Sequence, residues 1–170
     1  MVSRSNGHTT RTRPGSRWWA AALVLWVLFV WSRSLYGGDE SSGQSLWVVE
    51  RVRWLFESLG VTDADTMTFI VRKTAHFLEY LVLGVLASLA FGPWRAHGRE
   101  RVRRAVAAAV VCACVPVADE TIQLFVPGRA GMVADMLLDM SGCATGLLLA
   151  WLATALRRKH VQLGVCKISG

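Results

Sequence analysis

The chain has 170 residues, of which 53% are hydrophobic and eight are tryptophan, a composition typical of a small integral membrane protein rather than a soluble globular domain. Its formal net charge is +7, but the basic residues cluster at the ends of apolar runs. There they set membrane topology, so nucleic acid is excluded as the expected partner. The four cysteines have no metal-binding spacing, and three lie within apolar runs, so we interpret them as packing residues.

The N-terminal part predicts a tail and a first membrane span. Residues 1–17 are polar and basic and contain no acid, which indicates a disordered cytoplasmic tail. The next segment, about 18–36, is apolar through Trp31 and predicts a span. A signal-peptide core is the alternative, because the preceding residues are basic. No small-residue cleavage motif follows, whereas further apolar runs do, so we favour a retained span.

An amphipathic helix is predicted after the first span. Gly37–Ser45 consists of turn formers and predicts a loop. Beyond it, Val48, Val52, Leu55 and Leu59 recur at helical spacing in a segment that also carries tryptophans and charges. This segment is too charged to span and favours a juxtamembrane helix on the outer face of the bilayer. A helix packed on its own domain is the alternative.

Three more spans complete the predicted fold. Asp63–Thr66 offers capping residues, so we expect the second membrane helix to begin near them. Gly92–Arg104 is predicted to be a basic loop. The sequence therefore predicts an all-α membrane protein in which residues 18–156 form a four-span domain and residues 157–170 a basic cytoplasmic tail. The expected spans are about 18–36, 70–92, 105–126 and 132–156.

The positive charges predict the orientation in the membrane. The two tails and the basic loop hold thirteen of the nineteen Lys and Arg residues and one acid. By the positive-inside rule, both termini are expected in the cytoplasm, with the first and third connections outside.

This topology gathers the polar side chains of the apolar runs at one depth. They fall in the outer half of the expected spans: His76, Glu79 and Tyr80 in the second; Asp119, Glu120 and Gln123 in the third; Asp135 and Asp139 in the fourth; and Arg72, Lys73 and Arg129 at the outer boundary. Ionisable groups inside a membrane are costly and indicate a functional site.

Helical spacing places these residues on shared faces. Arg72, His76, Glu79 and Tyr80 share one helix face, and Asp119 and Gln123 share another. Asp135 and Asp139 continue into Gly142 and Gly146 as one stripe, and the glycines predict a close helix contact. We expect this contact to draw the acidic end of the stripe into the centre of the bundle.

Two segments also carry a family resemblance. RKTAHFLEYLVLG (Arg72–Gly84) followed by DETIQLFVPGRAGMVADMLLDMSGCATG (Asp119–Gly146) resembles the VanZ-like family of bacterial membrane proteins, and SSGQS (Ser41–Ser45) resembles a serine-rich element of that family. The resemblance covers the second to fourth expected spans, and its specificity lies in the order of the motifs. The family's named member is associated with teicoplanin resistance. The resemblance therefore implies glycopeptide or lipoglycopeptide resistance at the cell envelope and implies no particular reaction.

The residues themselves allow several kinds of site. His76 with Glu79 or Glu120 could form an acid–base pair, with Asp119, Asp135 and Asp139 as further catalytic candidates. The ligand-binding candidates are Arg72, Lys73, Tyr80, Gln123 and Arg129. The cations would bind the phosphate or carboxylate of a lipid-linked cell-wall precursor or a lipoglycopeptide.

Two further interpretations stay open. His76 and Glu79 with one or two of the aspartates or Glu120 could hold a metal ion, as in a metal-dependent intramembrane hydrolase or transferase, although this is not a tight metal signature. Alternatively, the cations could merely neutralise the acids and fix the register of the helices. No nucleophilic Ser or Cys stands at a diagnostic spacing from the histidine, so the residues leave open whether the site is catalytic. They also leave open which cofactor it uses and how the chain oligomerises.

Overall fold

The protein is built from helices. The computed structural model describes residues 14–35, 38–127 and 131–168, with side chains described for 17–35, 46–127 and 131–158. No strand occurs in these ranges, which confirms the all-α expectation. The elements are α1 (Pro14–Ser34), α2 (Gly38–Ser58), α3 (Ala64–Phe91), the short 3₁₀ helix η1 (Pro93–Arg95), α4 (Gly98–Gln123) and α5 (Val133–Ile168).

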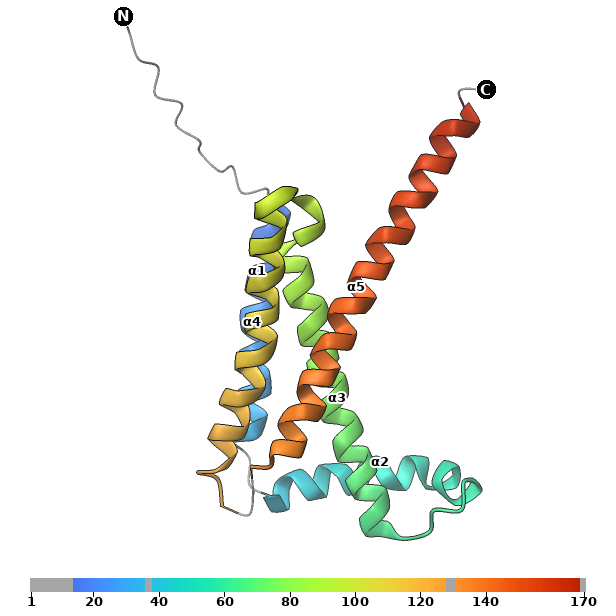
Figure 1. The fold of residues 1–170 in the computed structure, drawn as a ribbon. Coiled ribbons are helices and arrows are strands. Elements are labelled where there is room, and N and C mark those ends of the chain that lie inside the picture. The colour runs from blue at the N-terminus through green and yellow to red at the C-terminus, as the bar shows by residue number, and fades with distance from the viewer. Residues whose placement is uncertain (1–13, 36–37, 128–130, 169–170) are drawn as a thin grey trace, which may run out of the picture.

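Helix α3 is the centre of the arrangement. It packs against α1, α2, α4 and α5, and its contact with α5 is the most extensive. Figure 1 shows α1, α3 and α4 running side by side, with α5 crossing α3 obliquely and its C-terminal half extending away from the other helices, while α2 lies across one end of the bundle. The N-terminal end of α3 therefore lies beside the C-terminal ends of α1 and α4 and the start of α5.

Both ends of α3 are defined by local chemistry. Asp63 is the N-cap residue, and its carboxylate accepts hydrogen bonds from the backbone N–H of Thr66 at 2.8 Å and from the Thr66 hydroxyl at 2.5 Å. The side-chain hydrogen bond, with help from the backbone one, lowers the pKa of Asp63. At the other end Gly92 has φ 53°, a left-handed conformation that suits glycine. The predicted helix start is confirmed.

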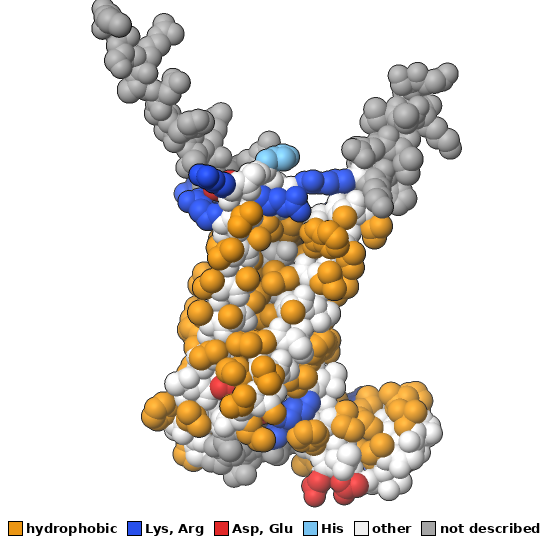
Figure 2. All heavy atoms as spheres, in the orientation of Figure 1, with side chains coloured by type: hydrophobic (Ala, Val, Ile, Leu, Met, Phe, Trp, Pro, Cys, Tyr) orange, Lys and Arg blue, Asp and Glu red, His pale blue; other side chains and the backbone are white. Residues whose placement is uncertain are grey.

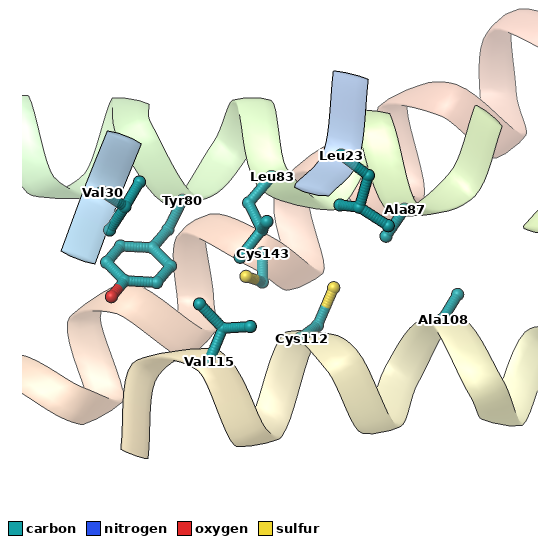
Figure 3. Packing of buried hydrophobic residues seen from close by; sticks show 9 residues of the cluster. All are labelled: Leu23, Val30, Tyr80, Leu83, Ala87, Ala108, Cys112, Val115 and Cys143. Atoms are coloured by element: carbon teal, nitrogen blue, oxygen red, sulfur yellow. The ribbon is translucent and has the colours of Figure 1, made fainter. Parts of the chain in front are cut away.

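The hydrophobic core lies between all four long helices. Figure 3 shows its buried side chains, which come from α1 (Leu23, Val30), α3 (Tyr80, Leu83, Ala87), α4 (Ala108, Cys112, Val115) and α5 (Cys143). Two of the cysteines, Cys112 and Cys143, are thus buried packing residues, as expected, whereas Cys114 is exposed. The core makes α1 an integral part of the bundle.

Close backbone contact joins α3 to α5. A Cβ atom added to Gly142 would lie 2.5 Å from the carbonyl oxygen of Phe77 and 3.2 Å from Cβ of Tyr80. One added to Gly146 would overlap the carbonyl oxygen of Leu81. Only glycine allows this approach, so the contact predicted from the Gly142–Gly146 spacing is confirmed.

The outside of the bundle is apolar. Figure 2 shows hydrophobic side chains along the helices and Lys and Arg side chains gathered at the end near η1. Within the described residues, three helical segments are long and apolar enough to cross a membrane: 64–95, 98–123 and 133–158. Helix α1 also presents apolar side chains outward, including Leu25.

Several predicted boundaries were wrong. Residues 38–45 are not a loop, because α2 begins at Gly38. Gly92–Arg104 is not a continuous loop either, since α4 begins at Gly98 and the Glu100–Arg104 ion pair at 2.8 Å supports its first turns.

The last helix is longer than the expected fourth span. Helix α5 continues to Ile168 through residues expected as a tail, which include the strong helix formers Leu, Arg and Lys. The predicted amphipathic helix lies within α2. There the buried residue is Val49, while Val48, Leu55 and Leu59 of the predicted apolar stripe are exposed.

Candidate functional site

Polar side chains from four helices converge at the end of the bundle opposite η1. The described members come from the C-terminal part of α1 (Arg33, Ser34), the first half and the middle of α3 (Lys73, His76, Glu79), the end of α4 (Asp119, Glu120, Gln123) and the start of α5 (Asp135, Asp139). They share one end because neighbouring helices run in opposite directions. The helices thus bring these residues toward the same end of the bundle.

Three of these side chains form a buried centre, which we define as His76, Asp119 and Asp139. One ligand-type atom from each lies within 4.8 Å of the others, and His76 Nδ1 is 3.8 Å from Asp139 Oδ1. Both aspartates are 0% exposed. The glycine contact between α3 and α5 explains this burial, because Asp139 stands one helical turn before Gly142 on the same stripe.

The buried centre carries several polar atoms without a hydrogen-bond partner among the described residues. They are His76 Nδ1, Asp119 Oδ1 and both carboxylate oxygens of Asp139. An unsatisfied buried polar atom costs about 1–3 kcal/mol, and more when it is charged. Proteins rarely leave such groups unpaired, so their concentration here indicates a site that binds something.

A hydrogen-bonded amide orients Asp119. Gln123 Nε2 donates to Asp119 Oδ2 at 3.2 Å and lies 3.4 Å from the Ser34 hydroxyl oxygen. This agrees with the predicted common face of Asp119 and Gln123. The contact also connects α4 to the C-terminal end of α1 and leaves Asp119 Oδ1 free toward the buried centre.

Two ion pairs surround the buried centre as a partly exposed rim, defined as Arg33, Lys73, Glu79 and Asp135. Lys73 bonds to Asp135 and connects α3 to α5. Arg33 Nε lies 3.0 Å from Glu79 Oε1 and connects α1 to α3. The side chains of Lys73 and Glu79 keep 19% and 18% of their surface exposed, and that of His76 keeps 21%, so the rim and the histidine are accessible from outside while both aspartates are covered.

Glu120 has a different role from the one expected. Its Oε2 accepts the backbone N–H of Met132 at 2.8 Å, which ties the end of α4 to the residues just before α5. Neither Glu79 nor Glu120 makes a hydrogen bond or ion pair with His76 among the described residues, so the expected acid–base pair stays a prediction. His76 faces Asp139 instead, and Glu79 is occupied by Arg33.

The remaining candidates occupy different positions. Tyr80 is 0% exposed, and Figure 3 shows its hydroxyl pointing away from Leu83 and Cys143, at the end of the core nearer the buried centre. Arg72 is half-buried. Arg129 and most of the predicted turn at 127–131 lie outside the described residues, as do the side chains of Ser41–Ser45.

Arg33 and Ser34 were not among the predicted site residues. The signal that could have found them is the polar triplet Ser32-Arg33-Ser34 at the end of an apolar run, at the depth of the other polar residues. Only the packing of α1 on α3 and α4 reveals their partners.

The site's chemistry follows from its donors. An imidazole and two carboxylates in a water-poor interior can hold a cation or exchange protons with a bound group. Charged rim residues of both signs offer contacts to a polar headgroup.

Comparison with protein families gives a match over most of the chain. The family model of VanZ/LLP1 matches residues 19–154, which include every described member of the site. Comparisons with curated proteins and with solved structures gave no match.

Proposed function

The chain belongs to the VanZ/LLP1 family, and from this premise we propose that it acts at the cell envelope in low-level resistance to teicoplanin-type glycopeptides and lipoglycopeptides. In this proposal its polar site binds or modifies a lipid-linked or amphiphilic ligand in the outer leaflet. Family membership and three apolar helices make the chain a multi-pass membrane protein, which is the setting this function needs.

The proposed topology has four spans with both termini in the cytoplasm. Helix α1 is the first of these spans, in addition to the three apolar segments in α3, α4 and α5. Its support is that Leu23 and Val30 join the core while Leu25 and Leu28 face outward, as expected for a helix between protein and lipid. The basic residues near η1 then lie on the cytoplasmic side, and the polar site lies toward the outside.

The observation that carries the proposal is the buried centre itself. Asp119 and Asp139 are fully buried among apolar helices, yet most of their oxygens lack partners within the described residues. A bundle that used charge only to fix its register would pair these acids, as it does at the rim. The unpaired acids therefore favour a working site over a purely structural one.

The rim and α2 suggest how an amphiphilic ligand would be held. Lys73 and Arg72 would bind its phosphate or carboxylate at headgroup depth, together with Arg129. Helix α2 lies across the same end of the bundle and exposes Trp47 and Trp54, which suits the membrane interface. We place α2 on the outer face, with the acyl chains of the ligand beside it.

A resistance assay tests the proposal. Expression in a teicoplanin-sensitive bacterium should raise the inhibitory concentration of teicoplanin, and Asp119→Asn should abolish the increase at equal protein level in the membrane. Glu100→Gln is the matched control, because it removes an exposed acid far from the site and should keep full resistance. Full resistance with Asp119→Asn would reject the site, and no increase with the unmodified chain would reject the function.

A structural role for the charges is the second candidate, favoured by the two interhelical ion pairs of the rim. It predicts that Asp119→Leu with Asp139→Leu yields a folded protein that retains resistance, because apolar groups can replace buried charges at little cost. The proposed function predicts a folded protein that has lost resistance.

A further inference from the structure

We propose that the buried centre binds one divalent transition-metal ion, Zn²⁺ or Mn²⁺, through His76, Asp119 and Asp139. This assignment deepens the proposed function and rests on it for the biological setting. It selects three ligands from the larger group of candidates in the sequence, and it rests on geometry, burial and charge.

The distances in the buried centre suit a shared ion. At 3.8 Å, His76 Nδ1 and Asp139 Oδ1 are too far apart for a good hydrogen bond. Two ligands bound to one tetrahedral zinc ion at about 2.1 Å are themselves separated by about 3.4 Å. All three ligand-type atoms lie within 4.8 Å of one another, so small side-chain rotations would bring them around one ion.

The rest of the site leaves these acids without a partner. Asp135 is paired with Lys73, Glu79 with Arg33, and Glu120 accepts the backbone N–H of Met132. Among the described residues, the polar neighbours of Asp119 are the Gln123 amide and the Tyr80 hydroxyl, and Asp139 faces the histidine.

A divalent cation would balance the charge of this pair. Two buried carboxylates carry two negative charges, which one divalent ion neutralises while the imidazole stays neutral and binds as a nitrogen ligand. Buried charges in proteins are paired or coordinate metals. Both aspartates are fully buried and present unpartnered oxygens, so this is a ligand cage and not a surface cluster of acids.

The donor types narrow the choice of ion. One imidazole with two carboxylates lacks the thiolates that select Cu(I), and the imidazole disfavours Mg²⁺ and Ca²⁺ relative to Zn²⁺ or Mn²⁺. Gln123 holds Asp119 through Oδ2 and leaves Oδ1 for the ion, which is the usual arrangement around a metal ligand. Three protein ligands also leave a coordination position open for a ligand group.

Metal analysis of the purified full chain in detergent is the first test. After chelation and reconstitution with Zn²⁺ or Mn²⁺ alone, the unmodified protein should retain one ion per chain by elemental mass spectrometry. Asp139→Asn should weaken binding by more than the ~10–100-fold that follows loss of an outer-shell partner. Glu100→Gln, which removes an acid outside the site, should bind as the unmodified chain does.

A second variant, His76→Cys, tests metal coordination if Asp139→Asn fails to fold. His76→Cys keeps a ligand at the position, so its Co²⁺ complex should show a thiolate-to-cobalt charge-transfer band that the unmodified protein lacks. No ion bound to the unmodified chain with either metal, unchanged binding by Asp139→Asn, or no such band would overturn the assignment. Resistance in a protein that binds no metal would reject the metal site and keep the proposed envelope function. Metal binding without resistance would reject the proposed function and keep the metal site.

Discussion

Replacing Gly142 by alanine tests how the α3–α5 contact builds the site. The added Cβ would lie 2.5 Å from the carbonyl oxygen of Phe77, whereas ordinary contacts begin at 3.4 Å. The helices must therefore separate locally by up to about 0.9 Å, a distance set by backbone atoms that cannot rotate away. Phe77 directly follows His76 in the chain, and Gly142 lies one turn from Asp139, so the strain acts on the buried centre itself.

The expected effects concern both stability and the site. Overpacking of this kind costs about 1–3 kcal/mol, which should appear as a lower unfolding midpoint in detergent micelles. Functional constellations need to be held to within about 0.5 Å, so the wider His76–Asp139 separation should also reduce metal retention and resistance. Elemental analysis and the teicoplanin assay measure the second effect at a temperature where the variant stays folded.

Ala144→Leu is the matched control. It adds more volume only two residues away on α5, but Ala144 faces outward, so stability and metal retention should stay close to those of the unmodified protein. If Gly142→Ala proved as stable as the control, with full metal retention, the close contact would not be what brings His76 and Asp139 together.

Three further predictions follow from the ion pairs, the topology and the turn. Arg33→Glu should lower the unfolding midpoint slightly, because Arg33 is 39% exposed and its ion pair with Glu79 contributes about 1 kcal/mol or less. Adding Glu79→Arg should restore the midpoint, and a double variant no more stable than the sum of the two single changes would show that the ion pair contributes nothing. A reporter after Lys159 should be active only in the cytoplasm and one inserted at 36–37 only outside, and reversed signals would contradict the outward orientation of the site. Arg129→Lys should impair resistance nearly as much as Arg129→Ala at equal protein level, because lysine lacks the planar fork that binds phosphate or carboxylate at two points, and full activity with lysine would reject that role.

The sequence by itself determined the class of fold and the composition of the site. Long apolar runs predict membrane helices because a bilayer cannot satisfy an exposed backbone, and charges are rare enough within them that His76, Asp119 and Asp139 stand out. Helical periodicity also predicted that Asp119 shares a face with Gln123 and that the stripe through Gly142 forms a close contact. Both are local properties of one helix, which the order of residues specifies.

Only the tertiary structure decided which charges are paired and which are not. Every acid in the apolar runs looked equivalent in the sequence, and His76 was expected to face Glu79 or Glu120. In the folded protein Glu79 is paired with Arg33 and Asp135 with Lys73, while His76 meets Asp139. Helical spacing gives the face of a residue on its own helix, but its partner depends on the rotation and height of the neighbouring helix. For His76 and Asp139 they are set by the packing of small residues between α3 and α5, and for Glu79 by the packing of α1 on α3; both are properties of two surfaces together and not of either segment alone.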